Sequence, residues 1–357
     1  MSVVARMSME DRHGLFGSVA NDPSGVLPRP IALPIVEKDA WVCFLLERLY
    51  RIPGFAPTAT NAPVLFKGGT SLSKAFRLIE RFSEDVDVTL DPALFGMSHA
   101  TPPGESSSAR RRRLDAINAA CSAFVCGNLQ SALARDLSDI LGVENPIVVD
   151  PDDSDRQTLR FLYPGSASSS ATYVLPYVKL EFGARSDREP WELRPIRSWA
   201  AQARPEAGLD PAFDVPVLRA ERTFWEKATI LHAENTRARS GKPPPKAWTR
   251  LSRHAYDLAS MEGAPVANDA LNDGELLRRV CECKQERFPS GHVNYLAVDP
   301  TSIEIVPRGA LLLPLESDYE RMSIMFFGEP PPWANVMAGL ESLERRVRQM
   351  PWGPVVR

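Results

Sequence analysis

Hydrophobic and polar residues alternate strictly along residues 85–91, DVDVTLD, the most clearly patterned stretch of the chain. In an extended strand the two valines and the leucine point to one side, while Asp85 and Asp87 point to the other. Upstream, the apolar residues 64–66 predict a second strand, which a glycine turn joins to a helical pattern over residues 71–82. Strand, turn, helix and strand together predict an α/β unit.

Helical periodicity dominates much of the remaining sequence. Apolar residues recur at helical spacing in residues 36–50, 114–142, 221–239, 250–261 and about 333–350. Residues 158–164 and 171–185 predict two strands joined across a GSASSS turn, with Glu181 on the polar side of the second. The apolar run at residues 310–316 also favours a strand. These patterns predict an α/β half followed by a mainly helical half.

Four other segments bear on how these halves are organised. Residues 1–33 show no sustained period and predict a flexible N-terminal arm, and the proline-rich residues 190–216 predict the connection between the halves. Residues 37–39, Glu-Lys-Asp, are expected to be a solvated first helical turn. Residues 98–113 end in four arginines, and this segment is either a mobile surface loop or an electrostatic contact to RNA phosphate.

The composition narrows the class of protein. The chain has 357 residues, 44% hydrophobic and 24% charged, and a formal net charge of -3. This charge argues against a protein that coats nucleic acid, although it permits a local basic groove. Five cysteines give no disulfide framework, and Cys281-x-Cys283 lacks the second pair that a zinc site needs. With no apolar run of membrane-spanning length, we expect a cytoplasmic protein without a membrane partner.

The candidate chemistry lies in residues 64–91. Gly68-Gly69 follows a strand and precedes a helix, where free backbone N–H groups attract an anion such as phosphate. Thr70 and Ser71 supply hydroxyl groups, either as helix caps or as further donors. Asp85 and Asp87 repel each other unless a cation lies between them, which favours a divalent metal ion. Phosphate turn and paired carboxylates together predict chemistry on a nucleoside triphosphate.

Other polar residues are less distinctive. Glu181 is a third strand carboxylate that is expected either to join the face of Asp85 and Asp87 or to lie on the surface. By spacing alone, Lys227 and Asp257 are expected to be ordinary charges on helix surfaces.

Eight segments give the sequence a family resemblance. FKGGTSLSKAF followed by RFSEDVDV resembles the AbiEii/AbiGii group of nucleotidyltransferase-like toxins in the DNA polymerase β-like superfamily. The segments VEKDAWV, KLEFGAR, ERTFWEKATILH, SRHAYDL, KQERFPSGHVNY and MFFGEPP are similar to segments of the larger members, in the same order. The resemblance runs from about residue 36 to 331.

The resemblance implies an α+β fold, with a polymerase β-like nucleotidyltransferase core built on a mixed sheet and a mainly helical C-terminal subdomain. Together with the sequence patterns, it predicts a flexible arm over residues 1–33, the core over 34–190, and a subdomain over 191–357 that completes the active site. Site residues carried over from the family, or assigned beside its motifs, are Asp85 and Asp87 as metal ligands, Lys227, Asp257 and Glu181 as further catalytic residues, and Lys67, Gly68, Gly69, Thr70, Ser71 and Lys74 as the phosphate-binding set. One departure stands out, since many smaller members have an Arg-Asp pair where this chain has Arg253-His254.

The resemblance also implies a function. We expect a toxin-like enzyme that uses a nucleoside triphosphate with Mg²⁺ or Mn²⁺ and transfers nucleotides to an RNA acceptor, the 3′ end of tRNA. It is expected to serve a toxin–antitoxin or phage-defence system, with a winged-helix antitoxin as partner. Two alternatives remain open: transfer of a nucleotide or phosphate to a protein or small-molecule hydroxyl, and a nucleotide-binding regulator without turnover.

Overall fold

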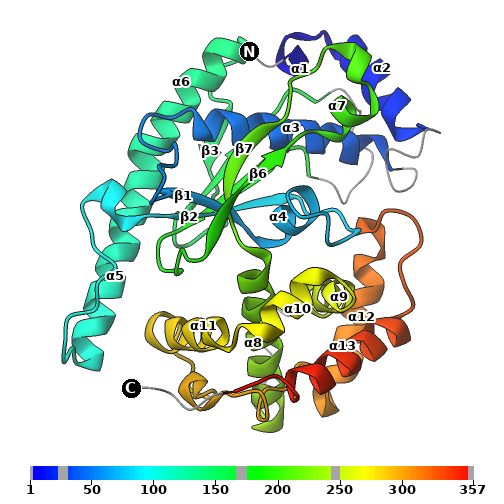
Figure 1. Cartoon of the computed structure of the whole chain (residues 1–357). Coiled ribbons are helices and arrows are strands. Elements are labelled where there is room, and N and C mark those ends of the chain that lie inside the picture. Colours follow the sequence, from blue (N-terminus) through cyan, green and yellow to red (C-terminus); the bar gives the residue numbers. More distant parts are fainter. Residues whose placement is uncertain (1–2, 23–30, 166–174, 243–249, 353–357) are drawn as a thin grey trace. The chain divides into compact units, whose positions relative to one another are not determined.

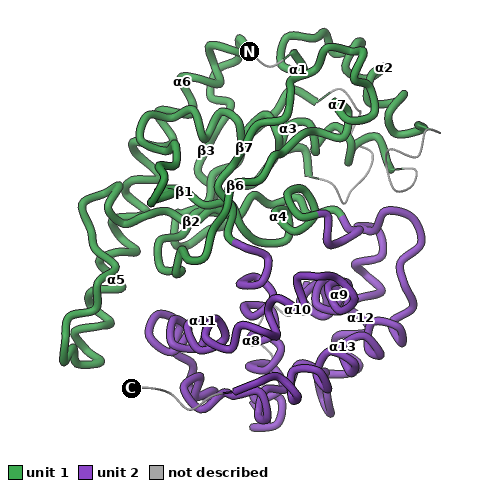
Figure 2. Tube along the Cα trace, viewed as in Figure 1, with its two compact units in different colours: residues 1–76, 82–218 green, residues 77–81, 219–357 purple. Residues whose placement is uncertain are grey.

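The computed structural model describes residues 3–22, 31–165, 175–242 and 250–352. The chain divides into two compact units (Figure 2): unit 1 comprises residues 1–76 and 82–218, and unit 2 comprises residues 77–81 and 219–357. The short segment 77–81 therefore belongs to unit 2, although both of its flanks in the sequence belong to unit 1.

A mixed sheet forms the centre of unit 1 (Figure 1). Its seven strands among the described residues are β1 (Val64–Lys67), β2 (Asp85–Leu90), β3 (Ile147–Val149), β4 (Thr158–Phe161), β5 (Val178–Gly183), β6 (Trp191–Ile196) and β7 (Phe213–Leu218), in the order β3-β4-β5-β2-β1-β7-β6. Strand β2 pairs antiparallel with β1 and parallel with β5. The α+β fold with a mixed sheet is therefore confirmed.

Strand β2 has the predicted pattern, because its two valines and Leu90 are fully buried. By contrast, the interpretation of residues 190–216 as a connection was wrong. Residues 191–196 and 213–218 form the antiparallel pair β6 and β7 at one end of the sheet. Pro195 and Pro216 hid these strands, since proline cannot donate a ladder hydrogen bond; β6 tolerates its proline because it is an edge strand.

Helix α3 (Leu33–Tyr50) packs against the sheet, and Trp41 and Phe44 both lie near the ring of Phe161 in β4, with centroids 5.9 and 6.1 Å away. The helix begins three residues earlier than the pattern indicated, so Glu37, Lys38 and Asp39 lie beyond its first turn. All three are buried, contrary to the expected solvated turn. Burial is possible because the charges are paired: Lys38 bonds Glu84 at 2.8 Å, and Asp39 bonds Lys74 at 2.5 Å.

The N-terminal region is also more ordered than expected. Residues 3–20 form helices α1 (Val3–Arg6) and α2 (Met9–Ala20), and α2 contacts α3. Phe16 and Val19 are fully buried, which docks α2 onto unit 1. The expected flexible arm is therefore wrong for residues 3–20; residues 1–2 and 23–30 of it lie outside the described part.

A continuous helical segment follows β2, formed by α5 (Ser107–Phe124), a π-turn (Val125–Leu129) and α6 (Gln130–Leu141) (Figure 1). It confirms the predicted helix over residues 114–142 and extends it back through the four arginines, so these are not in a mobile loop. Ser106 caps the helix by accepting from the N–H of Ala109, and Arg113 donates two hydrogen bonds to Glu105. A contact between these arginines and RNA stays a prediction.

Unit 1 is completed by two short helices, α4 (Gly68–Lys74) and α7 (Trp199–Ala203). The long elements of unit 2 among the described residues are helices, α8 (Ala220–Arg239), α9 (Ser252–Met261), α10 (Pro265–Asn272), α11 (Gly274–Arg287), α12 (Leu312–Arg321) and α13 (Trp333–Val347). Helix α8 contacts α9, α10 and α11 and forms the centre of this unit.

The apolar run at residues 310–316 is helical, contrary to the predicted strand, because its exposed and buried leucines follow helical spacing: Leu311 and Leu315 are buried while Leu313 is 78% exposed. None of the helices in the described residues combines the length and the apolar character needed to cross a bilayer.

Candidate active site

The carboxylates predicted for metal binding share one face of the sheet with a third. Asp85 lies opposite Lys179 on strand β5, and Asp87 lies opposite Glu181. Neighbouring residues in register point to the same side of a sheet, so Asp85, Asp87 and Glu181 project from a common face. Strand register thus brings together three of the residues that the sequence analysis assigned.

Lys179 supplies a positive charge beside these acids. Its Nζ lies 3.0 Å from Oδ2 of Asp150. Burial lowers the pKa of Lys179, but the bond to Asp150 and the charges of Asp150 and Asp85 raise it above its usual value. Lys179 therefore stays protonated and offsets part of the repulsion among the carboxylates.

The donor set fits a hard divalent cation bound together with its substrate. No three Asp, Glu, His or Cys side chains within the described ranges are placed to hold a metal ion by themselves. Mg²⁺ is commonly held by one or two protein carboxylates, with water and substrate phosphates completing its coordination. Asp85 and Asp87 provide that number of carboxylates.

The glycine turn lies directly against the second of these acids. Gly68 has φ +78°, in the left-handed region that favours glycine, and a Cβ atom at this position would lie 2.0 Å from Oδ2 of Asp87. The strand pairing explains this approach, because Lys67, the residue before the turn, lies opposite Asp87. The candidate phosphate turn and a candidate metal ligand are therefore in van der Waals contact.

Helix α4, which follows the turn, is shorter than predicted. It ends at Lys74, and residues 77–81 belong to unit 2. The hydroxyl of Thr70 lies within hydrogen-bonding distance of the Ser83 and Asp85 carbonyls, and Ser71 Oγ donates to the Gly68 carbonyl at 2.9 Å. Both side chains are buried: Thr70 fixes the turn to the start of β2, whereas Ser71 bonds within the turn. The first N–H groups of the helix remain to meet a ligand.

Two lysines assigned to the phosphate-binding set differ in environment. Lys67 is the residue before helix α4 and is partly exposed, without a side-chain cap bond. Lys74 is buried, forms an ion pair with Asp39, and lies 4.5 Å from the centre of the Trp199 ring. In this structure Lys74 joins α4 to α3 and α7.

Replacing Gly68 with alanine is expected to damage both stability and activity. A residue with a side chain resists φ +78°, at a cost of about 1–2 kcal/mol, and the new methyl group would also displace Asp87. We expect Gly68→Ala to lower the free energy of unfolding by about 2–4 kcal/mol and to reduce nucleotide transfer, measured by denaturant titration and by product formation.

Gly96→Ala is the matched control for this prediction. Gly96 has φ +74°, but a Cβ atom there meets nothing within 4 Å. This variant should show the backbone cost alone, about 1–2 kcal/mol, with activity kept. Equal effects at the two positions would contradict the proposed contact between the turn and Asp87.

In unit 2, a buried charge cluster surrounds Asp257, which is fully buried on α9. Arg81 donates two hydrogen bonds of 2.7 Å to the two carboxylate oxygens, and Lys227 Nζ of α8 lies 2.9 Å from Oδ2. Nδ1 of His254 lies 3.4 Å from Lys227 Nζ. The structure thus pairs Lys227 with Asp257, and the expectation that both are surface charges was wrong.

Protonation states in this cluster follow from burial and from the neighbouring charges. Burial alone raises the pKa of Asp257, but the charges and hydrogen bonds of Arg81 and Lys227 lower it well below its usual range. Burial lowers the pKa of Lys227, against the opposing effect of Asp257. Burial and the charge of Lys227 lower the pKa of His254, so this imidazole is neutral and its Nδ1 accepts a hydrogen bond from the Lys227 ammonium group.

Arg81 is the residue of this cluster that the sequence analysis missed. It is 1% exposed and lies four residues before Asp85 in the sequence. Its guanidinium group bonds the Asp257 carboxylate, which in turn bonds Lys227. No periodic pattern marks it, because its partner Asp257 is 176 residues away. Of the assigned residues, Asp85, Asp87, Glu181 and the turn belong to unit 1, whereas Lys227 and Asp257 belong to unit 2. That all of them act on one phosphate stays a prediction.

Comparisons with known proteins identify the family. The sequence model of the nucleotidyl transferase AbiEii toxin, of type IV toxin–antitoxin systems, matches residues 54–343. No curated protein sequence matches the chain. Among solved structures, the chain is similar to MenT4, a nucleotidyltransferase toxin from Mycobacterium tuberculosis H37Rv, with 18% identity, a TM-score of 0.45, and coverage of 94% of this chain and 99% of MenT4. The family match covers most of the sequence, and the chain therefore belongs to the AbiEii family of nucleotidyltransferase toxins of type IV toxin–antitoxin systems.

Proposed function

We propose that this nucleotidyltransferase toxin transfers nucleotides from a nucleoside triphosphate to an RNA acceptor, the 3′ end of tRNA, with Mg²⁺ or Mn²⁺ as metal ion. The observation that most supports metal-dependent transfer is the common face of Asp85, Asp87 and Glu181, with the Gly68 turn in contact with Asp87. Enzymes of this family generally use a nucleoside triphosphate and a divalent metal ion, and the family implies an antitoxin partner.

In the proposed mechanism, the chain's own residues bind and orient the triphosphate. Asp85 and Asp87 hold the metal ion, which when bound neutralises charge on the phosphates. The backbone N–H groups of Gly68 and Gly69 donate to phosphate oxygens, while the buried hydroxyl of Thr70 keeps the turn against β2.

A fixed cation completes the proposed set. Lys227 stabilises negative charge that develops on the phosphates, and Asp257 holds its ammonium group in one position. Neutral His254 accepts a hydrogen bond from the same ammonium without adding a competing negative charge. Glu181 assists the attacking hydroxyl, whereas both oxygens of the buried Asp257 are already bonded by Arg81 and Lys227, which favours its role in holding the lysine over a role at the hydroxyl.

Radiolabelled nucleotides test this proposal. The full-length protein is incubated with total RNA, Mg²⁺ and each nucleoside triphosphate in turn, labelled at either the α- or the γ-phosphate. Nucleotide transfer predicts label from the α-position alone, in a product that ribonuclease destroys and that migrates as tRNA. Label from the γ-position would instead indicate phosphate transfer, and a ribonuclease-resistant product would indicate a protein or small-molecule acceptor. Binding of the triphosphate without any product would favour a regulator.

The biological setting is a separate part of the proposal. We expect a cognate antitoxin with a winged-helix fold and a role in defence against phage. Expression of the toxin alone should arrest growth, and co-expression with a winged-helix protein encoded next to it should restore growth. Arrest that this neighbour does not relieve would contradict the assignment of the antitoxin.

A further inference from the structure

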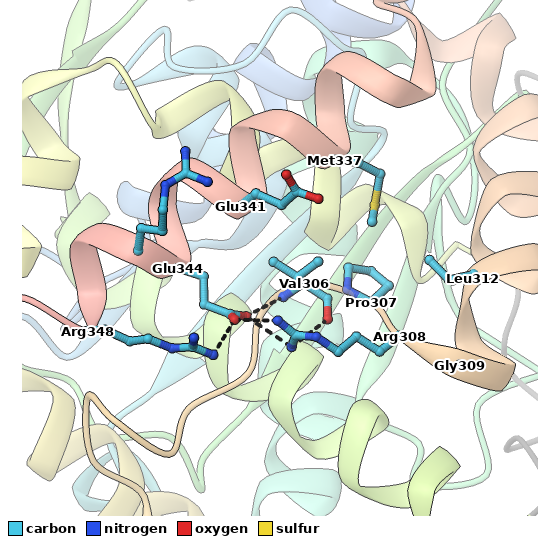
Figure 3. A pocket seen from close by; sticks show the side chains of 10 residues that line it. Val306, Pro307, Arg308, Gly309, Leu312, Met337, Glu341, Glu344 and Arg348 are labelled. Carbon is cyan, nitrogen blue, oxygen red and sulfur yellow. Dashed lines mark hydrogen bonds and ion pairs between the residues drawn. The ribbon is translucent and has the colours of Figure 1, made fainter.

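We propose that a cavity within unit 2 is a second phosphate-binding site, formed by residues other than those assigned to nucleotide transfer. Its ligand is a backbone phosphate of the acceptor RNA, an assignment that rests on the proposed function. The cavity has a volume of about 450 Å³ and lies between residues 306–309 and helix α13 (Figure 3). That volume lies in the range of pockets that bind small molecules. Val306, Leu312 and Met337 supply its apolar lining.

The wall of the cavity is held rigidly by buried side chains. Asn235 of α8 donates to the Val306 carbonyl at 2.9 Å and accepts from the Arg308 N–H at 3.1 Å. Glu344 of α13 accepts the N–H groups of Ile305 and Val306 at 2.9 and 3.0 Å. This irregular segment thus has its backbone groups paired by two helices, and the site is formed before any ligand binds.

Two arginines share the single carboxylate of Glu344. Arg308 and Arg348 each place a guanidinium nitrogen 2.6 Å from Oε1 of Glu344, as Figure 3 shows. Glu344 is 3% exposed, whereas the arginine side chains are 48% and 47% exposed. Each guanidinium has five N–H groups, so both retain donors for a ligand in the cavity. The shared carboxylate fixes their positions and neutralises only one of the two charges.

The net charge of the lining determines which kind of phosphate ligand the cavity prefers. Arg345 lines the cavity and is without an ion-pair partner among the described residues, and Glu341 is exposed. Three arginines against two glutamates leave one net positive charge. One phosphodiester carries one negative charge and accepts bidentate hydrogen bonds from guanidinium groups. A nucleoside triphosphate carries several negative charges, so the cavity suits the RNA backbone better, and its apolar lining can contact the attached nucleoside.

The signal of the Met337 methyl group reports on this site directly. In the full chain carrying Asp85→Asn, which prevents turnover, methyl-labelled methionine is followed by NMR, and Met337→Leu assigns the signal. A short single-stranded oligoribonucleotide should shift the Met337 signal at lower concentration than inorganic phosphate or a nucleoside triphosphate. A triphosphate that shifts it at lower concentration than the RNA would overturn the assignment to RNA, and an unmoved signal would overturn the site.

Three charge variants test the recognition. Arg345→Gln should raise about tenfold the RNA concentration needed to shift the Met337 signal, because it removes an attractive charge. Glu341→Gln should lower that concentration by a few fold, because it removes a repulsive charge. Arg321→Gln on α12 is the matched control, since Arg321 is exposed in the same unit but does not line the cavity. Arg308 and Arg348 are kept, because changing them would also disturb the wall.

Equal binding by Arg345→Gln and the parent protein, or equal losses in Arg345→Gln and Arg321→Gln, would overturn the proposal. Its failure is distinguishable from failure of the proposed function. An RNA-dependent shift of Met337 that Arg345→Gln weakens supports the cavity even if total RNA gives no labelled product. Labelled tRNA together with an unmoved Met337 signal would leave the proposed function standing and exclude the cavity.

Discussion

Replacing Asp85 with asparagine is expected to reduce nucleotide transfer by about 10³-fold or more, since the metal ion contributes several kcal/mol to stabilising the transition state. Asparagine keeps the size of the side chain and removes the charge that attracts the cation. Asp85 lies on the common face with Asp87 and Glu181, and the same loss is expected for Asp87→Asn. Rates of product formation at saturating triphosphate measure this effect.

The stability of these variants should change little. Asp85 and Asp87 are both partly exposed on strand β2, and removing the Asp85 charge relieves repulsion from the neighbouring carboxylates but also gives up its attraction to Lys179. Thermal unfolding of Asp85→Asn should therefore lie close to that of the parent protein. Asp115→Asn serves as the control, because Asp115 is an exposed carboxylate on α5 with only a 3.9 Å ion pair to Arg111. Full activity in Asp85→Asn would refute the metal assignment.

Local patterns predicted the part of the candidate site that lies on strands. The alternation along β2 is set by neighbouring residues, and it placed Asp85 and Asp87 opposite the buried valines. Glu181 was expected either on this face or on the surface, and the register between β2 and β5 was needed to place it opposite Asp87. The conformation of Gly68 also follows from a local requirement, since its positive φ favours glycine.

Partners that are distant in sequence were beyond these patterns. Lys38 and Asp39 look like surface charges in a helix, and their burial depends on partners from other elements, among them Glu84 for Lys38 and Lys74 for Asp39. The role of Arg81 could not be predicted for the same reason, since its partner Asp257 is 176 residues away in the sequence. An ion pair between residues distant in sequence produces no pattern in the neighbouring residues, so it cannot be predicted from periodicity.

Substitution of Asp257 by asparagine is expected to destabilise the protein by about 3–5 kcal/mol, because it removes the carboxylate charge that two buried cations bond. Arg81 and Lys227 are 1% and 5% exposed, and both bond the Asp257 carboxylate. Denaturant titration at pH 7 measures this loss. A variant as stable as the parent protein would show that the cluster does not contribute as described.

The pH dependence of this loss has a defined sign. The pKa of Asp257 in the folded protein is lowered below its unfolded value of about 3.9. Its contribution is therefore fully present above that value and is lost as the pH falls towards the folded pKa. The stability difference between the parent protein and Asp257→Asn should narrow as the pH falls below about 4, provided that the folded state persists there.

A second substitution separates the two cations. Lys227 can respond to the missing carboxylate by releasing its proton, since its pKa is already lowered by burial, whereas Arg81 stays charged. Lys227→Met should therefore lower the free energy of unfolding less in the Asp257→Asn background than in the parent protein. In the double variant one buried cation, instead of two, has lost the Asp257 carboxylate. Both single variants should lose transfer activity, Lys227→Met because the cation is gone and Asp257→Asn because the cation is neither fixed nor kept charged. Strict additivity of the two stability losses would mean that Lys227 and Asp257 do not act as a pair. It would contradict the proposed role of Asp257 in positioning Lys227.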